Sequence, residues 1–102
     1  MAPKKQASSP YRLRVSAETA SLLRGLHPQL KRKIKAALKL ITADPDAGKS
    51  LREELKGLKS FRTGRFRIIY RPLSLKIIEL IAVGPRRTIY EETYRIVRKE
   101  KT

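Results

Sequence analysis

Arginine alternates with apolar and aromatic residues along an acid-free stretch, residues 58–71. Successive side chains of a strand point to opposite faces. One face is therefore expected to turn apolar side chains to a core: Phe66, Ile68 and Tyr70. The other face is expected to carry Arg65, Arg67 and Arg71 beside Ile69. A guanidinium group is always charged and donates hydrogen bonds as a fork, so this strand predicts a rigid phosphate-binding surface.

The charge of the chain supports that interpretation. Its 102 residues include 25 lysines and arginines and only 9 acids, which gives a net charge of +16. No acid lies between Glu54 and Glu79. Such an excess of positive charge attracts polyanions, so the expected partners are RNA, DNA, a ribosome or an acidic protein. A membrane surface is disfavoured, because the cations are expected on strands rather than on one amphipathic helix.

Several other classes of protein are disfavoured by composition. The chain has no cysteine and a single histidine, His27, so no metal site and no cofactor are expected. No apolar run approaches the roughly 20 residues that span a bilayer. The first ten residues are polar and lack the apolar core of a secretion signal. The sequence therefore predicts a soluble cytoplasmic protein.

The N-terminal half predicts a strand and a pair of helices. Residues 1–10, rich in Lys, Ser and Pro, are expected to form a flexible basic tail, and residues 11–102 a single domain. Alternation predicts a strand over 11–15, with Tyr11, Leu13 and Val15 facing inward. Ser16 is expected to cap a helix over 17–26.

A second helix is expected to begin at Pro28, beside His27 as a turn or cap residue. Its apolar face repeats at helical spacing: Leu30, Ile34, Ala37, Leu38 and Ile41. Asp44–Gly48 should end it. The short connection makes the two helices an antiparallel hairpin.

The C-terminal half predicts a sheet. A helical turn is expected at 50–55, strands at 58–62 and 65–71 around a Thr63-Gly64 turn, and a turn at 72–74. The apolar run 75–83 is typical of a central strand, and 91–99 of a helix. The expected fold is α+β: an N-terminal strand, a helical hairpin, a mostly antiparallel twisted sheet of about four strands, and a C-terminal helix. The hairpin should cover one face and leave the other concave and lined by arginines.

Three segments in this order resemble the RelE/ParE toxins of type II toxin–antitoxin systems. They are residues 55–58 (Leu-Lys-Gly-Leu), 62–70 (Arg-Thr-Gly-Arg-Phe-Arg-Ile-Ile-Tyr) and 83–90 (Val-Gly-Pro-Arg-Arg-Thr-Ile-Tyr). In that family the RelE branch cleaves messenger RNA in the ribosomal A site. The ParE branch instead poisons DNA gyrase. The resemblance implies a cognate antitoxin protein as a partner of either branch.

The resemblance also implies roles for individual residues. Arg67 matches the arginine that binds the scissile phosphate, and its alternative role is a solvated arginine on a strand. Arg86, or its neighbour Arg87, matches the arginine that stabilises charge or protonates the leaving group. Its alternative role is that of an ordinary loop arginine. Tyr90 matches the tyrosine that stacks a base or takes the 2′-hydroxyl proton, with packing in the core as the alternative.

One feature departs from the nuclease pattern. The best-known nucleases of the family carry two lysines, one residue apart, on the strand before the turn, where this chain has 58–62 as Leu-Lys-Ser-Phe-Arg. The RNA-binding residues are therefore predicted to be the remaining cations of this region: Lys56, Lys59, Arg62, Arg65 and Arg87.

The favoured hypothesis is a toxin that acts as an endoribonuclease on messenger RNA at the ribosome and so inhibits translation. The alternatives are a gyrase inhibitor without nuclease activity and a non-toxic basic RNA-binding homologue. Convergence of Arg67, Arg86 and Tyr90 on one concave face would favour the nuclease. A Tyr90 side chain that points into the core would weaken that hypothesis.

Overall fold

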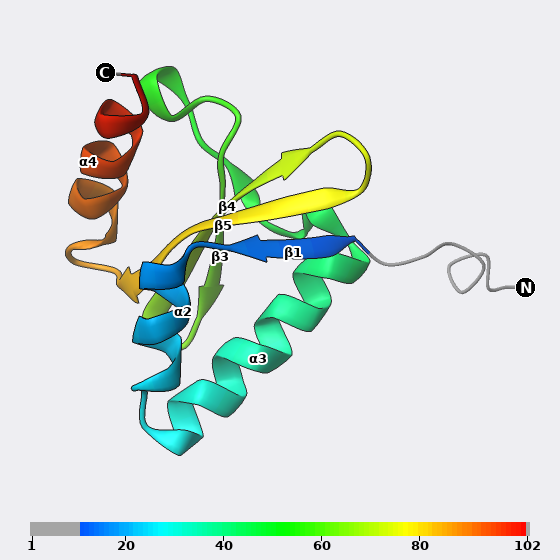
Figure 1. The fold of residues 1–102 in the computed structure, drawn as a ribbon, viewed down its shortest axis with the longest axis vertical. Helices are drawn as coiled ribbons and strands as arrows, with labels where there is room; N and C mark the ends of the chain where they lie inside the picture. The colour runs from blue at the N-terminus through cyan, green and yellow to red at the C-terminus, as the bar shows by residue number, and fades with distance from the viewer. Residues whose placement is uncertain (1–10, 102) are drawn as a thin grey trace, which may run out of the picture.

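The computed structural model describes residues 11–101, so the expected tail at 1–10 lies outside the described part. Its strands form one five-stranded sheet in the order β1-β5-β4-β3-β2 (Figure 1). The strands are β1 (Arg12–Val15), β2 (Lys49–Ser50), β3 (Lys59–Thr63), β4 (Phe66–Leu73) and β5 (Ile77–Pro85). The helices are α2 (Ala17–Arg24), α3 (Pro28–Ala43) and α4 (Ile89–Lys101), with 3-10 turns at Pro45–Ala47 and Glu53–Leu55. No helix within residues 11–101 is long and apolar enough to cross a bilayer.

Both helices of the hairpin begin at the predicted caps. The Ser16 hydroxyl accepts a hydrogen bond from the Thr19 backbone N–H at 3.1 Å. Nδ1 of His27 accepts one from the Gln29 N–H at 3.2 Å, directly before Pro28. These bonds satisfy N–H groups that the helices leave without a partner at their first turns. The capping role predicted for Ser16 and the turn or cap role predicted for His27 are confirmed.

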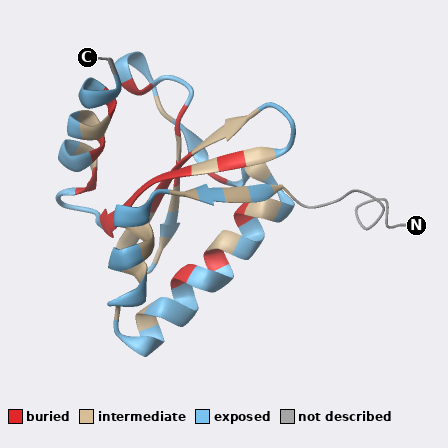
Figure 2. Cartoon of the chain, viewed as in Figure 1, coloured by how far each residue is buried: buried red, intermediate tan, exposed pale blue. Residues whose placement is uncertain are grey.

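The first core lies between α3 and one face of the sheet (Figure 2). The predicted apolar face of α3 supplies its buried side chains Ile34, Ala37 and Ile41. The sheet supplies Ile68, Tyr70, Ile78, Leu80 and Val83, and Phe66 packs against them half-buried. The inward direction predicted for alternate residues of β4 is therefore confirmed.

A second core fills the space between α4 and the opposite face of the sheet (Figure 1). Its buried members are Leu55, Leu58, Ile69, Ile81, Ala82, Ile89 and Val97. A register shift opposite Ile69 and Tyr70 lets both Ile81 and Ala82 of β5 reach this core, because a bulge breaks the alternation of a strand. The prediction of an open, arginine-lined concave face is thus wrong in extent, since α4 covers part of it.

The turns of the sheet differ from the predictions. Thr63 pairs with Phe66, so the hairpin turns at Gly64 and Arg65 rather than at Thr63 and Gly64. Gly64 has a φ of +63°, a conformation that side chains rarely adopt. Arg65 therefore lies in the turn and not in the strand. The next turn falls at 74–76, after β4 has continued through Pro72, and the two-residue strand β2 was not predicted.

Arg71 does not join a phosphate-binding row. Its guanidinium donates to Glu79 of β5 and to Glu100 of α4, with both Nη2 contacts at 2.9 Å. Partial burial opposes its charge, but the hydrogen bonds to Glu100 and Glu79 outweigh it and raise the pKa of Arg71. Arg71 thus ties α4 to the sheet.

Tyr70 fixes the segment that follows α3. Its buried hydroxyl donates to the Pro45 carbonyl at 2.7 Å and accepts from the Gly48 N–H at 2.8 Å. Burial raises the pKa of Tyr70, the Gly48 N–H opposes that effect, and the carboxylates of Asp44 and Asp46 add to it.

Tyr70→Phe is expected to lower the free energy of unfolding by about 1–3 kcal/mol, because two backbone groups lose their partner. Since the folded-state pKa is raised, the stabilisation by the neutral hydroxyl is complete below the unfolded value of about 10 and is lost as pH rises further. Denaturant titrations at pH 8 and at about pH 11 measure both effects. The difference in the free energy of unfolding between wild type and Tyr70→Phe should be smaller at the higher pH. A larger difference there would contradict a raised pKa of Tyr70.

Candidate active site

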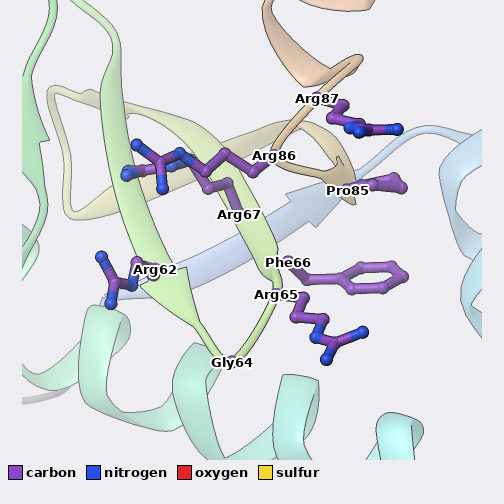
Figure 3. Close-up of a pocket in the computed structure, with 8 residues that line it drawn as sticks. All are labelled: Arg62, Gly64, Arg65, Phe66, Arg67, Pro85, Arg86 and Arg87. Carbon is purple, nitrogen blue, oxygen red and sulfur yellow. The ribbon is translucent and has the colours of Figure 1, made fainter.

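A groove rich in arginine lies where the β3–β4 hairpin meets the connection from β5 to α4. It encloses about 450 Å³. Five of its eight lining residues are arginines, and none is acidic, so the groove is built for an anion. The lining residues are Arg62, Gly64, Arg65, Phe66, Arg67, Pro85, Arg86 and Arg87 (Figure 3).

The register of the sheet brings these arginines together. Arg62 of β3 pairs with Arg67 of β4, and Arg67 pairs with Gly84 of β5. Directly paired residues share a face, so Arg62 and Arg67 stand side by side. The Arg86 N–H donates to the Arg65 carbonyl at 3.1 Å, which fixes the connection after β5 against the hairpin turn.

Arg67 and Tyr90 meet at the hydroxyl of Ser60. Nη1 of Arg67 lies 3.1 Å from the Ser60 Oγ, and the Tyr90 hydroxyl lies 3.2 Å from the same atom. Ser60 is 3% exposed. Tyr90 is half-buried and packs with its ring against the second core. The ring of Tyr90 therefore packs in the core, which was the alternative weighed for this residue, and Tyr90 does not line the groove. Its hydroxyl contacts Ser60, and a part for it in catalysis stays a prediction.

The guanidinium of Arg67 retains binding capacity. Its Nε is the one buried side-chain polar atom within residues 11–101 that has no hydrogen-bond partner. An unpaired buried donor is costly unless a ligand supplies an acceptor.

The five arginines point in two directions. In Figure 3 the side chains of Arg62, Arg67 and Arg86 extend to one side of the hairpin, and those of Arg65 and Arg87 to the other. Of the two candidates after Gly84, Arg86 is thus the one that shares a side with Arg67. All five line the groove, so the predicted cations Arg62, Arg65 and Arg87 belong to the same surface.

The two predicted lysines lie apart from the arginines. Lys59 pairs with Tyr70 in the sheet and so shares the face of Tyr70, opposite to that of Arg67. Its Nζ donates to the Ser50 hydroxyl at 2.8 Å and lies 3.6 Å from the Asp46 carboxylate. Lys56 is exposed after the second 3-10 turn and does not line the groove. RNA binding by these lysines stays a prediction.

Sequence reasoning missed Ser60. The alternation of β3 places Ser60 and Arg62 on one face, opposite the face of Phe61, and this signal was available. The contact with Tyr90 was not, because the two residues are 30 positions apart. Within the described part no group of three or more acidic, histidine or cysteine side chains could hold a metal ion. The site thus offers guanidinium groups for a phosphate and two hydroxyls that can carry protons.

The sequence of the chain defines its family. Residues 11–90 match the family model described as the ParE toxin of the type II toxin–antitoxin system, parDE. This match covers most of the chain, so the protein belongs to the RelE/ParE family of toxins of type II toxin–antitoxin systems. No curated protein matches the chain.

Solved structures of this family have the same fold. A chain of the Mycobacterium tuberculosis RelBE2 toxin–antitoxin complex is 28% identical, with a TM-score of 0.67 over 76% of this chain and 100% of that chain. A mutant of the Escherichia coli toxin RelE in the free state is 19% identical, with a TM-score of 0.71 over 92% and 100%. The archaeal RelE–RelB complex from Pyrococcus horikoshii is 21% identical, with a TM-score of 0.62 over 76% and 97%. Two of these three structures are complexes with an antitoxin.

Proposed function

We propose that this toxin is an endoribonuclease that cleaves messenger RNA in the ribosomal A site and thereby stops translation. One observation supports this function above the others. Arg67 and Tyr90, which reach the site from a strand and a helix, meet at Ser60, and Arg86 lines the same groove as Arg67. A surface that only docks onto a protein needs neither a guanidinium group that can bind phosphate nor a tyrosine hydroxyl held against the same buried serine oxygen.

The proposed reaction is attack by the 2′-hydroxyl on the adjacent phosphate. The bond from phosphorus to the 2′-oxygen forms, and the bond to the 5′-oxygen breaks. Arg67, which lines the groove, binds the phosphate through its guanidinium and balances its growing charge, because guanidinium donors match phosphate oxygens. Tyr90 takes the proton of the 2′-hydroxyl after its own oxygen has given up its proton to water. Arg86 stabilises the charge on the departing 5′-oxygen. The departing oxygen takes its proton from water.

The test uses purified protein with ribosomes programmed with a defined message. Primer extension is expected to find cuts inside translated codons that require the ribosome. Cuts should disappear in Arg67→Ala and weaken strongly in Tyr90→Phe. An intact message at protein concentrations that stop cell growth would overturn the nuclease function.

Inhibition of DNA gyrase is the second candidate, and two observations favour it. The matching family model is named for ParE. Ser60 and its neighbours also stand where the nuclease pattern has its spaced lysines. A supercoiling assay with purified gyrase separates the candidates, because a gyrase inhibitor blocks supercoiling and leaves messages uncut.

The outer face of α3 supports a further contact with the ribosome. Lys31, Lys35 and Lys39 recur one turn apart, are exposed, and share a helix that contains no acid. Like charges at this spacing destabilise a helix, so a polyanion that neutralises them would be favoured.

Replacing these three lysines with glutamine is expected to raise KM for programmed ribosomes at moderate salt and to leave kcat unchanged. The slope of log affinity against log salt should fall by about 2, since each phosphate contact contributes somewhat less than one unit. Binding measured between about 50 and 200 mM salt checks this. An unchanged slope would remove α3 from the interface.

A further inference from the structure

Ser60 is one of two polar residues classed as buried within the described part of the chain, the other being Thr93. The Thr93 hydroxyl donates to the Ile89 carbonyl one turn earlier in α4, at 2.7 Å. That bond is local and common for a helical threonine. The partners of Ser60 instead come from two other elements, Arg67 of β4 and Tyr90 of α4.

Packing alone does not explain a serine at this position. Ser60 pairs with Ile69, and both side chains face the second core. A buried hydroxyl is unfavourable unless it is hydrogen-bonded, and an alanine would fill the same space without that cost. What serine adds is an oxygen that Arg67 and Tyr90 share.

Because a hydroxyl both accepts and donates hydrogen bonds, the contact between Ser60 and Tyr90 can change direction. A serine oxygen has two acceptor positions and one proton. Arg67 occupies one acceptor position. The contact with Tyr90 can run either way: the tyrosine donates while it is neutral, and Ser60 can turn its own proton to the tyrosine oxygen once that oxygen has lost its proton. A nearby cationic donor makes the serine hydroxyl a better donor, because hydrogen bonds in a chain polarise one another.

We propose that Ser60 is a positioning residue that couples Arg67 to Tyr90. It holds the guanidinium of Arg67 in one orientation at the groove through Nη1, and it stabilises the Tyr90 oxygen when that oxygen is ready to take a proton. This role rests on the proposed nuclease function. It explains how a chain without the spaced lysines of related nucleases can organise the same end of the sheet.

The kinetic test compares Ser60→Ala with Ser60→Thr. Ser60→Ala is expected to lower kcat about 10- to 100-fold with little change in KM. This is less than the roughly 10²- to 10⁴-fold contribution of a group that transfers the proton itself, because Ser60 acts through Arg67 and Tyr90. Ser60→Thr keeps the hydroxyl and suits a strand, so it should restore most of the rate. In a Tyr90→Phe background, Ser60→Ala should lower kcat by a much smaller factor than it does alone, because the effects of mutations at coupled residues are not additive.

Thr93→Val is the matched control. It removes another buried hydroxyl at similar volume, and Thr93 does not line the groove, so cleavage should stay at the wild-type rate. If Thr93→Val and Ser60→Ala reduce cleavage equally, the effect is one of stability, and the coupling role fails. Additive effects of Ser60→Ala and Tyr90→Phe would also overturn it.

A second readout does not depend on cleavage. The Nε–H resonance of Arg67 in nitrogen-15 NMR spectra reports whether the guanidinium is held. We expect a resolved signal that shifts on titration with inorganic phosphate in the wild type and in Ser60→Thr, and an averaged, unresponsive signal in Ser60→Ala. If the wild type cuts no RNA and these spectra still differ as expected, the nuclease function fails and the positioning of Arg67 by Ser60 stands. Identical spectra in wild type and Ser60→Ala would refute the positioning itself.

Discussion

Arg67→Ala should abolish growth arrest on induced expression and lower the cleavage of ribosome-bound messages by about 100-fold or more. Removing one preorganised donor from a developing oxyanion has an effect of this size. Arg67 combines a buried Nε that lacks a partner with a bond from Nη1 to Ser60. The alanine leaves the phosphate without its central donor.

The variant should still fold, because Arg67 belongs to neither apolar core and its side chain is hydrogen-bonded to the Ser60 hydroxyl. Circular dichroism and thermal unfolding check this. Arg65→Ala is the control: Arg65 lines the same groove but points to the other side of the hairpin, so its loss should raise KM and leave kcat nearly unchanged (Figure 3). A soluble Arg67→Ala protein that still arrests growth would count decisively against the site.

Gly48→Ala is expected to be the most damaging small substitution in the sheet. A Cβ on Gly48 would lie 2.6 Å from the Tyr70 hydroxyl, 2.9 Å from Cε1 of its ring and 3.1 Å from the Ser60 carbonyl oxygen. Tyr70 is fully buried and cannot swing away. Relieving the overlap disrupts the packing of Tyr70 and breaks the hydrogen bonds of its hydroxyl. Together these losses should lower the free energy of unfolding by about 2–4 kcal/mol.

Such a loss corresponds to a fall in Tm on the order of 10–20 °C for a chain of this size. Gly25→Ala is the matched control, because the nearest atoms to a Cβ there are 3.7 and 3.8 Å away and its φ is −85°. That change should be neutral or slightly stabilising. A Tm of Gly48→Ala close to that of Gly25→Ala would show that the Tyr70 contact is not rigid. Because Gly48 approaches the Ser60 carbonyl, we also expect the damage to reach the groove.

The groove is accessible because α4 does not extend over it. This helix covers the second core, and Arg71 ties its end to the sheet through Glu100. The arginines remain uncovered at the hairpin end, where Arg65 and Arg86 join the two connections. A site at an edge suits the partners proposed for this toxin, since a polyanion and a neutralising protein both approach as extended surfaces.

The sequence by itself determined the features that depend on neighbours in the chain. Helical spacing in α3, alternation in β4 and the caps at Ser16 and His27 follow from local geometry, and each was predicted correctly. The ordered segments that carry Arg67, Arg86 and Tyr90 also identified the family, because residue type and spacing survive without coordinates.

Only the tertiary structure decided which side chains meet. The sequence placed Lys59 beside the arginines, but pairing with Tyr70 turns it to the other face. It placed Arg71 in the basic row, but Glu79 and Glu100 bind it from β5 and α4. Alternation places Ser60 on the face of Arg62, but no local pattern predicts that two distant elements share its oxygen. The reason is physical: periodicity fixes the direction of a side chain on its own element, while strand register and the path of α4 are set by long-range packing.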